Sequence, residues 1–308
     1  MHQLTRRQFH AASLAAIGTA AIPRSTLGEA QPEAKLPTVR WGKYEISRLL
    51  VGHNPIKATS HYSGALDKEM RDYFADSERG RQLLRRSQEV GINTCQMGAK
   101  NIEALLAAHY AAGGKMQWIA TFYSPPGKGK EELARILKME PRPIGAQHYG
   151  GTTDSLMRQG KIDQALDTIK ILRDAGLLVG LCSHNHEVID YAEDKGWDLD
   201  FYQGAFYRSC DSLKPSRKGE IFEEEARLSM ARTLGKVSKP CIAFKVLGAN
   251  RHCQTPADVE AALRFAYTHL KPTDVVLVGM WQKHRDQAAE NAGLVRKILG
   301  EGSGAGRG

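Results

Sequence analysis

The sequence has few cysteines and none in the pairs that mark zinc ribbons or redox motifs. It contains five cysteines in 308 residues, and no two of them stand at CxxC spacing, which argues against both kinds of site. Cys95 and Cys182 fall inside apolar runs, where a thiol is usually a small buried apolar group. Cys210 and Cys253 fall in predicted loops, and an extracytoplasmic disulfide between them has little support.

The chain also lacks the segments expected of a membrane protein or a nucleic-acid-binding protein. After the first thirty residues, no apolar run is long enough to span a bilayer. The net charge of +9 is scattered, with no basic stripe and interleaved aromatic residues. It therefore indicates solubility and weak attraction to anions rather than nucleic-acid binding. Residues 124–130 lack the GxxxxGK[ST] spacing of a phosphate loop and predict a flexible connection.

The first thirty residues predict an export signal. Arg6 and Arg7 form a twin-arginine pattern, followed by a small-residue apolar run over 11–22 and a cleavage site after Ala30. The run is too short for a membrane anchor and suits the central region of a signal peptide. We therefore expect a twin-arginine signal peptide over 1–30, the twin-arginine translocase as a partner during export, and a periplasmic or other extracytoplasmic location. Its removal leaves 278 residues with a net charge of +7.

The rest of the chain alternates between short apolar runs and amphipathic segments. The runs are rich in Val, Ile, Leu and Phe, as expected of strands buried on both faces. Thr255 and Pro256 open one helical segment with a cap residue and a first-turn proline. The predicted strands span residues 46–52, 92–97, 117–122, 143–148, 177–182, 199–206, 241–247 and 274–279. The predicted helices span 78–89, 101–112, 131–139, 162–174, 187–195, 222–237, 258–270 and 285–299.

Eight strand–helix pairs in strict alternation predict an α/β fold of the (β/α)8 TIM-barrel type. The barrel forms a single domain over residues 36–300, and the glycine-rich end, 301–308, predicts a flexible tail. A doubly wound open sheet is the alternative. In a (β/α)8 barrel, ligands bind at the carboxyl ends of the strands, so the polar residues at those ends are the candidate site.

Several short segments, in their order along the chain, resemble the aldo-keto reductase family. Residues 42–49 are similar to the family's opening hairpin and first strand, and residues 83–93 to its first helix and second strand. Residues 179–183 are similar to the fifth strand, and residues 278–291 to the last strand and helix. Together the segments cover nearly the whole predicted barrel. They are more specific for the fold than for the activity.

Together with the predicted export signal, the resemblance implies an exported oxidoreductase-like barrel that uses NADP or NAD. Its small-molecule substrate would be a small carbonyl or sugar-like compound. The positions that hold the nicotinamide ring in the family match Ser183 and Gln203 for the amide, and Phe244 for the ring face. The positions at the adenosine end match Gly279, Met280 and Asn291, with Lys283 and Arg285 as the basic residues near the place of a 2′-phosphate.

The acid–base residues of the family are mostly absent. Its reductases use an aspartate, a tyrosine, a lysine and a histidine. The lysine lowers the pKa of the tyrosine, which donates a proton while NADPH delivers hydride. The first three positions hold Thr94, Ala99 and Phe122. Only the histidine has a match, His148, which makes it the first candidate for the chemistry. Lys245 and Tyr123, from other strand ends, are candidates to replace the missing lysine and tyrosine.

Two other interpretations stay open. A metal-dependent lyase, isomerase or hydrolase would use His53, His148, His184 and His186 as imidazole ligands for Zn or Mn. The spacing is weak evidence, because His184 and His186 share a side only in an extended strand. A ligand-binding barrel without turnover would follow directly from the loss of three of the four catalytic groups.

Overall fold

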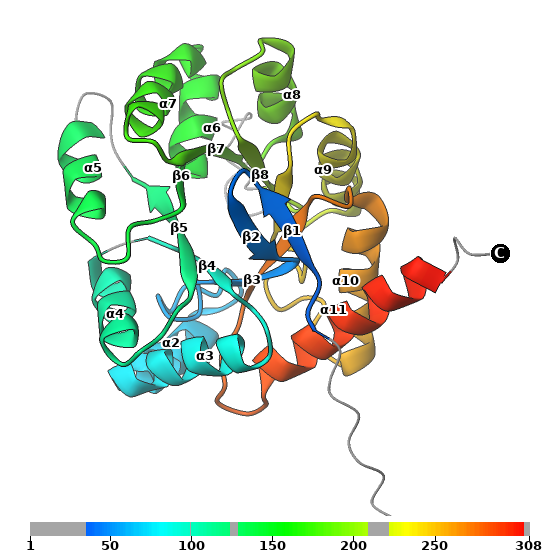
Figure 1. Ribbon diagram of the computed structural model, residues 1–308. Helices are drawn as coiled ribbons and strands as arrows, with labels where there is room; N and C mark the ends of the chain where they lie inside the picture. The colour runs from blue at the N-terminus through cyan, green and yellow to red at the C-terminus, as the bar shows by residue number, and fades with distance from the viewer. Residues whose placement is uncertain (1–34, 99, 124–128, 209–221, 305–308) are drawn as a thin grey trace, which may run out of the picture. The chain divides into compact units, whose positions relative to one another are not determined.

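The apolar runs form the strands of a closed parallel barrel. The computed structural model describes residues 35–98, 100–123, 129–208 and 222–304 (Figure 1). The predicted signal peptide and Cys210 lie outside these ranges, and export stays a prediction. The barrel strands are β3 (Leu49–Gly52), β4 (Thr94–Met97), β5 (Gln117–Phe122), β6 (Gly145–His148), β7 (Leu178–Ser183), β8 (Phe201–Ala205), β9 (Cys241–Phe244) and β10 (Val275–Gly279).

These eight strands pair side by side in chain order, all in parallel, and β10 pairs with β3 to close the ring. The predicted (β/α)8 TIM barrel is confirmed, and the open-sheet alternative is wrong. A closed ring leaves no unpaired strand edge, so the backbone groups of every strand are bonded on both sides.

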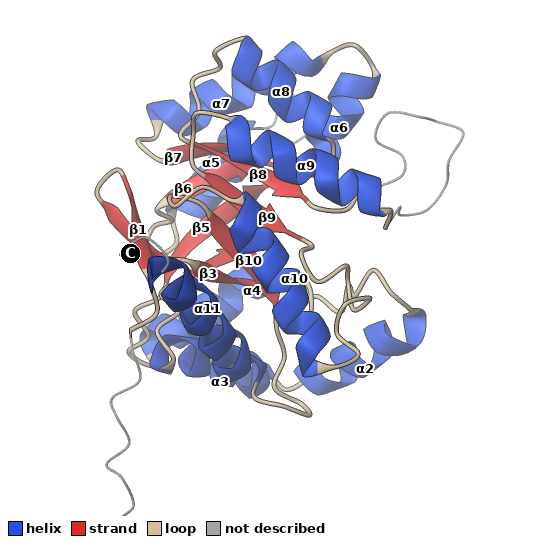
Figure 2. Ribbon diagram, turned by 90° about the vertical axis from the view of Figure 1, so that its right-hand side faces the viewer, coloured by secondary structure: helices blue, strands red, loops and turns tan. Residues whose placement is uncertain are grey.

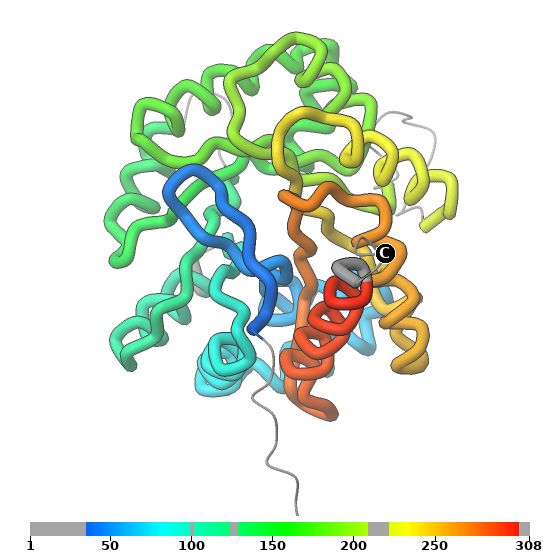
Figure 3. Tube along the Cα trace, turned by 45° about the vertical axis from the view of Figure 1, so that its right-hand side comes forward, coloured from blue at the N-terminus to red at the C-terminus, as the bar shows by residue number. Residues whose placement is uncertain are grey.

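Helices follow the strands and surround the barrel (Figure 2). Their buried apolar side chains, such as Leu83, Leu263 and Val295, pack on the outward-facing residues of the strands. Near the end of the chain, α10 packs against α11, and α11 packs against α3 (Figure 3). No helix in the described part of the chain combines the length and the apolarity needed to cross a membrane. The helices are α2 (Gly64–Phe74), α3 (Ser77–Glu89), α4 (Lys100–Ala111), α5 (Gly129–Leu137), α6 (Gly150–Arg158), α7 (Ala165–Asp174) after the 3-10 turn η1 (Ile162–Gln164), α8 (His186–Asp194), α9 (Glu224–Lys236), α10 (Pro256–His269) and α11 (Gln287–Gly304).

Two helices go beyond the predicted set. Residues 64–74, to which the sequence assigns no element, form α2, and the Ser63 side chain caps it by accepting the backbone N–H of Leu66 at 3.2 Å. Residues 150–158 form α6, although their glycines and threonines predict a loop. Thr153 and Leu156 on one face of α6 are buried. Tertiary burial therefore outweighs the weak helix propensity of this segment.

The ends of two other elements also differ from the prediction. The predicted first strand, 46–52, is divided at Arg48, because the chain turns there from an amino-terminal hairpin into the barrel strand β3. At the other end, α11 continues to Gly304, so it takes in the start of the predicted tail. Residues 305–308 lie outside the described part of the chain.

Strand alternation gives the inside of the barrel two layers of different chemistry. Successive side chains of a strand point to opposite faces, so every second residue faces inward. Toward the amino ends of the strands, the inward residues are apolar and form one cluster that includes Leu50, Ile119, Phe201 and Ile242. Toward the carboxyl ends they are largely polar. The barrel interior is therefore a dry core at one end and a polar floor at the other.

A hairpin of β1 (Thr38–Trp41) and β2 (Tyr44–Ser47) lies across the amino end of the barrel (Figure 1). The Trp41 ring stacks on Phe201 with 5.3 Å between ring centroids, and its Nε1 donates to the Thr273 carbonyl at 2.9 Å. Trp41 and Ile46 are both buried in the inner cluster. The hairpin therefore closes this end with apolar side chains and leaves the carboxyl end for ligands.

Replacing Trp41 with alanine should lower the free energy of unfolding by about 3–5 kcal/mol, because the buried ring would leave a cavity above Phe201. Trp41→Phe keeps most of the apolar contact and loses the Nε1 hydrogen bond, so it should cost only about 1–2 kcal/mol. Urea titrations followed by circular dichroism measure both changes. Equal and small losses for the two variants would show that the hairpin does not stabilise the barrel.

Candidate functional site

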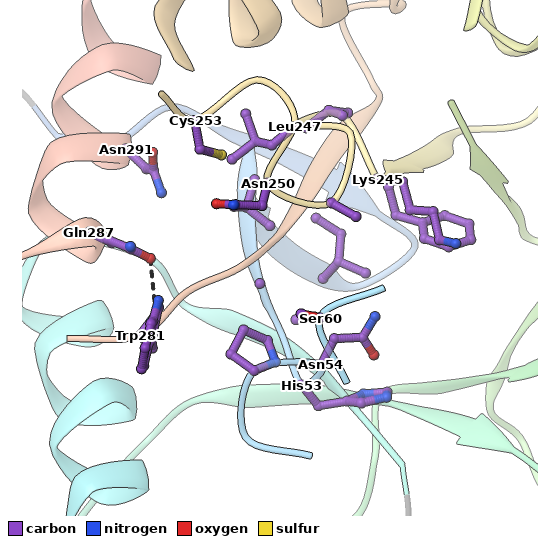
Figure 4. A pocket seen from close by; sticks show the side chains of 18 of the residues that line it. His53, Asn54, Ser60, Lys245, Leu247, Asn250, Cys253, Trp281, Gln287 and Asn291 are labelled. Carbon is purple, nitrogen blue, oxygen red and sulfur yellow. Dashed lines mark hydrogen bonds between the residues drawn. The ribbon is translucent and has the colours of Figure 1, made fainter. Parts of the chain in front are cut away.

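A cavity of about 850 Å³ lies at the carboxyl end of the barrel. Its walls include the β3–α2 loop (residues 53–63) and the β9–α10 loop (residues 245–255), and an outer arm runs beside α11. Figure 4 shows Asn250, from the β9–α10 loop, and Asn291, from α11, on either side of this arm. Its volume is typical of sites for small molecules and cofactors.

Three glutamines and a threonine, inward-facing residues of four strands, form the polar floor. Gln96 Nε2 donates to Thr121 Oγ1 at 2.5 Å. Gln147 and Gln203 are only 1% and 2% exposed, and their Oε1 atoms have no hydrogen-bond partner among the described residues. An unpaired buried carbonyl costs about 1–3 kcal/mol. The floor therefore offers two acceptors to a ligand that carries N–H or O–H groups.

Tyr123 and Lys57 meet on the cavity wall. Lys57 Nζ lies 3.4 Å from Tyr123 Oη and 5.2 Å from the centroid of the Tyr123 ring. Tyr123 directly follows β5, and Lys57 belongs to the β3–α2 loop, so the pair joins two strand ends that are not neighbours in the barrel. A Cβ at Gly98 would lie 2.6 Å from the Tyr123 ring, so the glycine leaves the room that this ring occupies. Tyr149 packs beside it at 4.5 Å between ring centroids.

Burial moves both members of this pair toward their neutral forms. It lowers the pKa of the Lys57 ammonium and raises the pKa of the Tyr123 hydroxyl, since each charged form loses hydration. The hydroxyl keeps its proton and the ammonium gives its proton up more readily. The free protein therefore favours a neutral hydroxyl beside Lys57, and the 3.4 Å contact leaves the two groups able to share a proton.

A buried carboxylate holds His184. Asp154 Oδ2 accepts His184 Nδ1–H at 2.7 Å, and Asp154 Oδ1 accepts the Ser183 hydroxyl at 2.6 Å. The backbone N–H of His184 points at the same carboxylate, 3.3 Å from each oxygen. Because a carboxylate only accepts, Nδ1 carries a proton, and in the neutral ring Nε2 is the atom with the lone pair. The imidazole lines the cavity with its ring centroid 5.4 Å from that of Phe244.

Neither Lys57 nor Asp154 follows from the sequence. Lys57 lies in a loop and belongs to no sequence motif. It reaches Tyr123 only because the closed barrel brings the loop after β3 close to the end of β5. Asp154 lies in the segment that predicts a loop. The first turn of α6 brings its carboxylate to the end of β7. Small residues followed by a single aspartate, as in 150–154, are common in loops, so the sequence does not mark Asp154 as a site residue.

Most of the predicted site residues line the cavity, and five do not. Those that line it are Tyr123, Lys245, Gln203, Phe244, Gly279 and Asn291, together with His53 and His184 from the metal alternative. Those outside the lining are His148, Ser183, Met280, Lys283 and, from the metal alternative, His186. Lys283 Nζ is paired with Glu69 at 2.7 Å, and Met280 is fully buried.

Strand alternation explains why His148 and Ser183 are not in the lining. His148 follows the inward residue Gln147 and so points out toward α6, where its Nδ1 lies 2.7 Å from Thr153 Oγ1. Ser183 likewise follows the inward residue Cys182, and its hydroxyl is engaged by Asp154. The structure therefore corrects the expected placement of both side chains, because strand ends were predicted without the phase of the alternation.

The four histidines of the metal alternative do not converge. The Nδ1 atom of His53 lies 3.1 Å from the Gln96 carbonyl, and that of His186 lies 3.3 Å from the Glu187 carboxylate on α8. His148 faces outward, and His184 is bound to Asp154. Within the ranges that the structure describes, no group of three or more His, Cys, Asp or Glu side chains is placed to hold a metal ion.

Unusual backbone conformations are concentrated in the two loops that border the cavity. Lys245, directly after β9, has φ +58°, a left-handed conformation that costs free energy for a residue with a side chain. Arg251 joins the two loops, because its Nη1 donates to the His61 carbonyl at 3.3 Å. Such strain is found mainly at functional sites. In the described part of the chain, the non-glycine residues with positive φ are Ala58, His61, Lys245, Ala249 and Asn250.

Comparison with known proteins supports the fold of this chain but does not assign it to a family. No protein-family profile and no curated protein sequence matches the chain. The apo structure of Gox0644 aligns with a TM-score of 0.56 and 8% identity, over 86% of this chain and 94% of that one. A thermostable aldo-keto reductase, Tm1743, in complex with the inhibitor epalrestat aligns with a TM-score of 0.54 and 12% identity, over 84% and 94%. An N-acetylneuraminic acid synthetase from Leptospira borgpetersenii reaches 0.47 at 11% identity, over 90% and 93%. At these identities the likeness establishes the TIM-barrel fold alone.

Two buried histidines should make the protein sensitive to acid. Burial lowers the pKa of His53 and of His148 to about 4, against about 6.5 in an unfolded chain. The unfolded state therefore binds more protons between these values, so the stability that is present above about pH 6.5 is lost as the pH falls toward 4.

His148→Gln removes one of these groups and keeps a donor for Thr153. Between about pH 7 and about pH 5, the variant should lose about 2 kcal/mol less stability than the wild type. Urea titrations at the two pH values measure the difference. His269→Gln, at the C-terminal end of α10, is the control and should follow the wild type. An H148Q variant that loses as much stability as the wild type would contradict a neutral His148.

Proposed function

We propose that the protein is an oxidoreductase that interconverts a small carbonyl or sugar-like compound and its alcohol, with a nicotinamide cofactor. The observation that carries the proposal is the Tyr123–Lys57 pair, with 3.4 Å between Nζ and Oη, on the wall of a cavity whose floor has unpaired amide carbonyls. The pair supplies the proton transfer that such a reaction requires, from positions other than those that the family resemblance implies. The shared fold adds support by analogy only.

The inner end of the cavity fits the amide head of a nicotinamide cofactor. The buried Gln203 Oε1 has no donor among the described residues, and a carboxamide carries an NH₂ group that can donate to it. Phe244 lines the same region with a flat apolar ring. At Gly279 a Cβ would lie 2.7 Å from Pro55, so the glycine lets Pro55 pack directly on the strand end, and Gly279 itself lines the cavity. Gln203, Phe244 and Gly279 would hold the ring end of the cofactor, which when bound supplies or accepts a hydride.

The outer arm offers polar groups and cations that are already paired. Asn250 and Asn291 border it (Figure 4). Arg285 Nε, in its lining, donates to Glu290 at 2.9 Å; Lys283 Nζ, outside the lining, donates to Glu69 at 2.7 Å. Exposed pairs of this kind are worth about 0.2–1 kcal/mol, so a phosphate group can compete for the cations. The proposal therefore covers both NADP and NAD.

The acid–base steps belong to Tyr123 and Lys57. During reduction, the Tyr123 hydroxyl gives its proton to the carbonyl oxygen of the substrate, and the neighbouring Lys57 ammonium stabilises the phenolate that remains. During oxidation, the same pair takes the proton of the alcohol. Tyr149 packs beside the Tyr123 ring, with 4.5 Å between ring centroids.

Cofactor binding is the first test. Titration with NADPH and with NADH should quench the fluorescence of Trp281, which lines the cavity. Gln203→Leu should weaken binding about tenfold, because one charge-neutral hydrogen bond is worth about 0.5–1.5 kcal/mol. Gln159→Leu, on the exposed carboxyl end of α6, is the matched control. Absence of binding by either nucleotide would overturn the proposed function.

The role of the pair is tested by turnover of a panel of small aldehydes and hydroxyketones with the bound nucleotide. Tyr123→Phe removes the proton donor and should lower kcat by about 10²–10⁴-fold, with little change in nucleotide affinity. Lys57→Met should move the alkaline limb of the pH profile upward, because it removes the cation beside the hydroxyl. Tyr44→Phe, in the hairpin at the opposite end of the barrel, should leave turnover unchanged. Full activity of Tyr123→Phe would exclude Tyr123 as the donor.

A further inference from the structure

The proposed redox reaction gives no role to the Asp154–His184 pair, whose imidazole lines the cavity. Asp154 is 3% exposed and receives the Ser183 hydroxyl, the His184 backbone N–H and the His184 ring N–H. These three donors fix the carboxylate, and the carboxylate fixes the imidazole tautomer. In the neutral ring, Nε2, on the side turned away from Asp154, is the nitrogen with the lone pair. Carboxylate–imidazole pairs with this geometry orient a general base.

The position of His184 in the cavity is set by close packing at the end of β6. A Cβ at Gly150 would lie 3.2 Å from His184 Cε1 and 2.8 Å from Cys182 Sγ, so only glycine leaves room for the ring. The preceding residue, Tyr149, lies 4.5 Å from Tyr123 between ring centroids. Because β5, β6 and β7 are neighbours in the barrel, His184 and Tyr123 flank one short segment, with the glutamine floor below them.

We propose that this cavity also catalyses cofactor-independent proton abstraction next to a carbonyl group, with His184 as the base and Tyr123 as the acid. The substrates would be small hydroxylated aldehydes and ketones, interconverted through an enediol. Gln147 and Gln203, with their unpaired Oε1 atoms, would accept the hydroxyl groups of these compounds. The proposal deepens the proposed function by naming hydroxycarbonyl compounds as the substrate class.

The reaction balances without an oxidant or a reductant. His184 Nε2 takes the proton from the hydroxyl-bearing carbon of the ketone. The C–H electrons form the carbon–carbon double bond, and the carbonyl oxygen takes the proton of Tyr123. The resulting enediol then returns its other hydroxyl proton to the Tyr123 phenolate, while His184 delivers its proton to the former carbonyl carbon. The product is the isomeric aldehyde, and both side chains regain their starting protonation.

Deuterium exchange tests the proposal without any nucleotide. Dihydroxyacetone, xylulose and fructose are incubated with the protein in D₂O, and proton NMR follows the loss of the carbon-bound proton and the appearance of the aldose. His184→Ala and His184→Gln should each lower the exchange rate at least about 100-fold. Added imidazole should restore part of the activity of His184→Ala, a rescue that a structural role would not produce.

Asp154 acts through His184 and is a positioning residue. Asp154→Asn should lower the kcat of exchange, with KM nearly unchanged, because the amide no longer fixes the Nδ1 proton. Melting temperatures confirm that each variant is folded. His269→Gln, at the C-terminal end of α10, is the matched histidine control and should exchange at the wild-type rate.

Three outcomes would overturn the proposal. The first is exchange of all three probes no faster than with His184→Ala. The second is His184→Gln as active as the wild type. The third is exchange that EDTA abolishes and zinc restores, which would assign the base to a metal-bound water. Nucleotide titration of the same preparations separates this proposal from the redox function. Exchange without nucleotide binding would refute only the redox function, and nucleotide binding without exchange would refute only this one.

Discussion

The two-residue alternation of the closed barrel is the constraint on which the rest of the structure depends. Eight short strands close into a ring, so each strand end delivers one side chain to the cavity and its neighbour to the helix layer. The Gln147 side chain points inward and forms part of the polar floor, whereas the His148 side chain points outward to α6. Cys182 faces inward and Ser183 does not. If a strand were shifted by one residue, a side chain that lines the cavity would be replaced by one that packs against a helix. Which residues of each strand point inward therefore decides the chemistry at the carboxyl end of the barrel.

The same constraint determines how far the sequence could predict the structure. The apolar runs give the barrel, since strands buried on both faces are the only common use for eight such runs between amphipathic segments. They do not show which residues point inward. An apolar run has no alternation of apolar and polar residues, and the polar residues are adjacent to one another at its end. Lys57 and Asp154 come from connections, where loop geometry and the first turn of α6 place them. Gln203 and Phe244, which the resemblance matches to cofactor positions, line the cavity, whereas Ser183, matched in the same way, does not.

The two ends of the barrel divide stability and function between them. At the amino end, the hairpin seals the ring with Trp41 and Ile46, and the inward residues there are apolar. At the carboxyl end, unpaired carbonyls on Gln147 and Gln203 and left-handed residues such as Lys245 cost stability in the free protein. A ligand that donates to the floor recovers part of this cost, so binding there is favoured by groups that the fold itself leaves unsatisfied.

Hydride transfer and proton abstraction need the same first event at this site, which is polarisation of a carbonyl oxygen. In the proposed reactions the Tyr123–Lys57 pair provides it, since the Tyr123 hydroxyl donates a hydrogen bond and a protonated Lys57 stabilises the phenolate against the cost of burial. A carbonyl polarised in this way accepts hydride more readily, and the C–H bond next to it becomes more acidic. With a base such as His184 at the adjoining strand end, held in one tautomer by Asp154, the acidified proton has an acceptor. The proposed isomerisation therefore follows from the proposed redox reaction whenever the substrate carries a hydroxyl on the carbon beside its carbonyl and the base reaches that carbon.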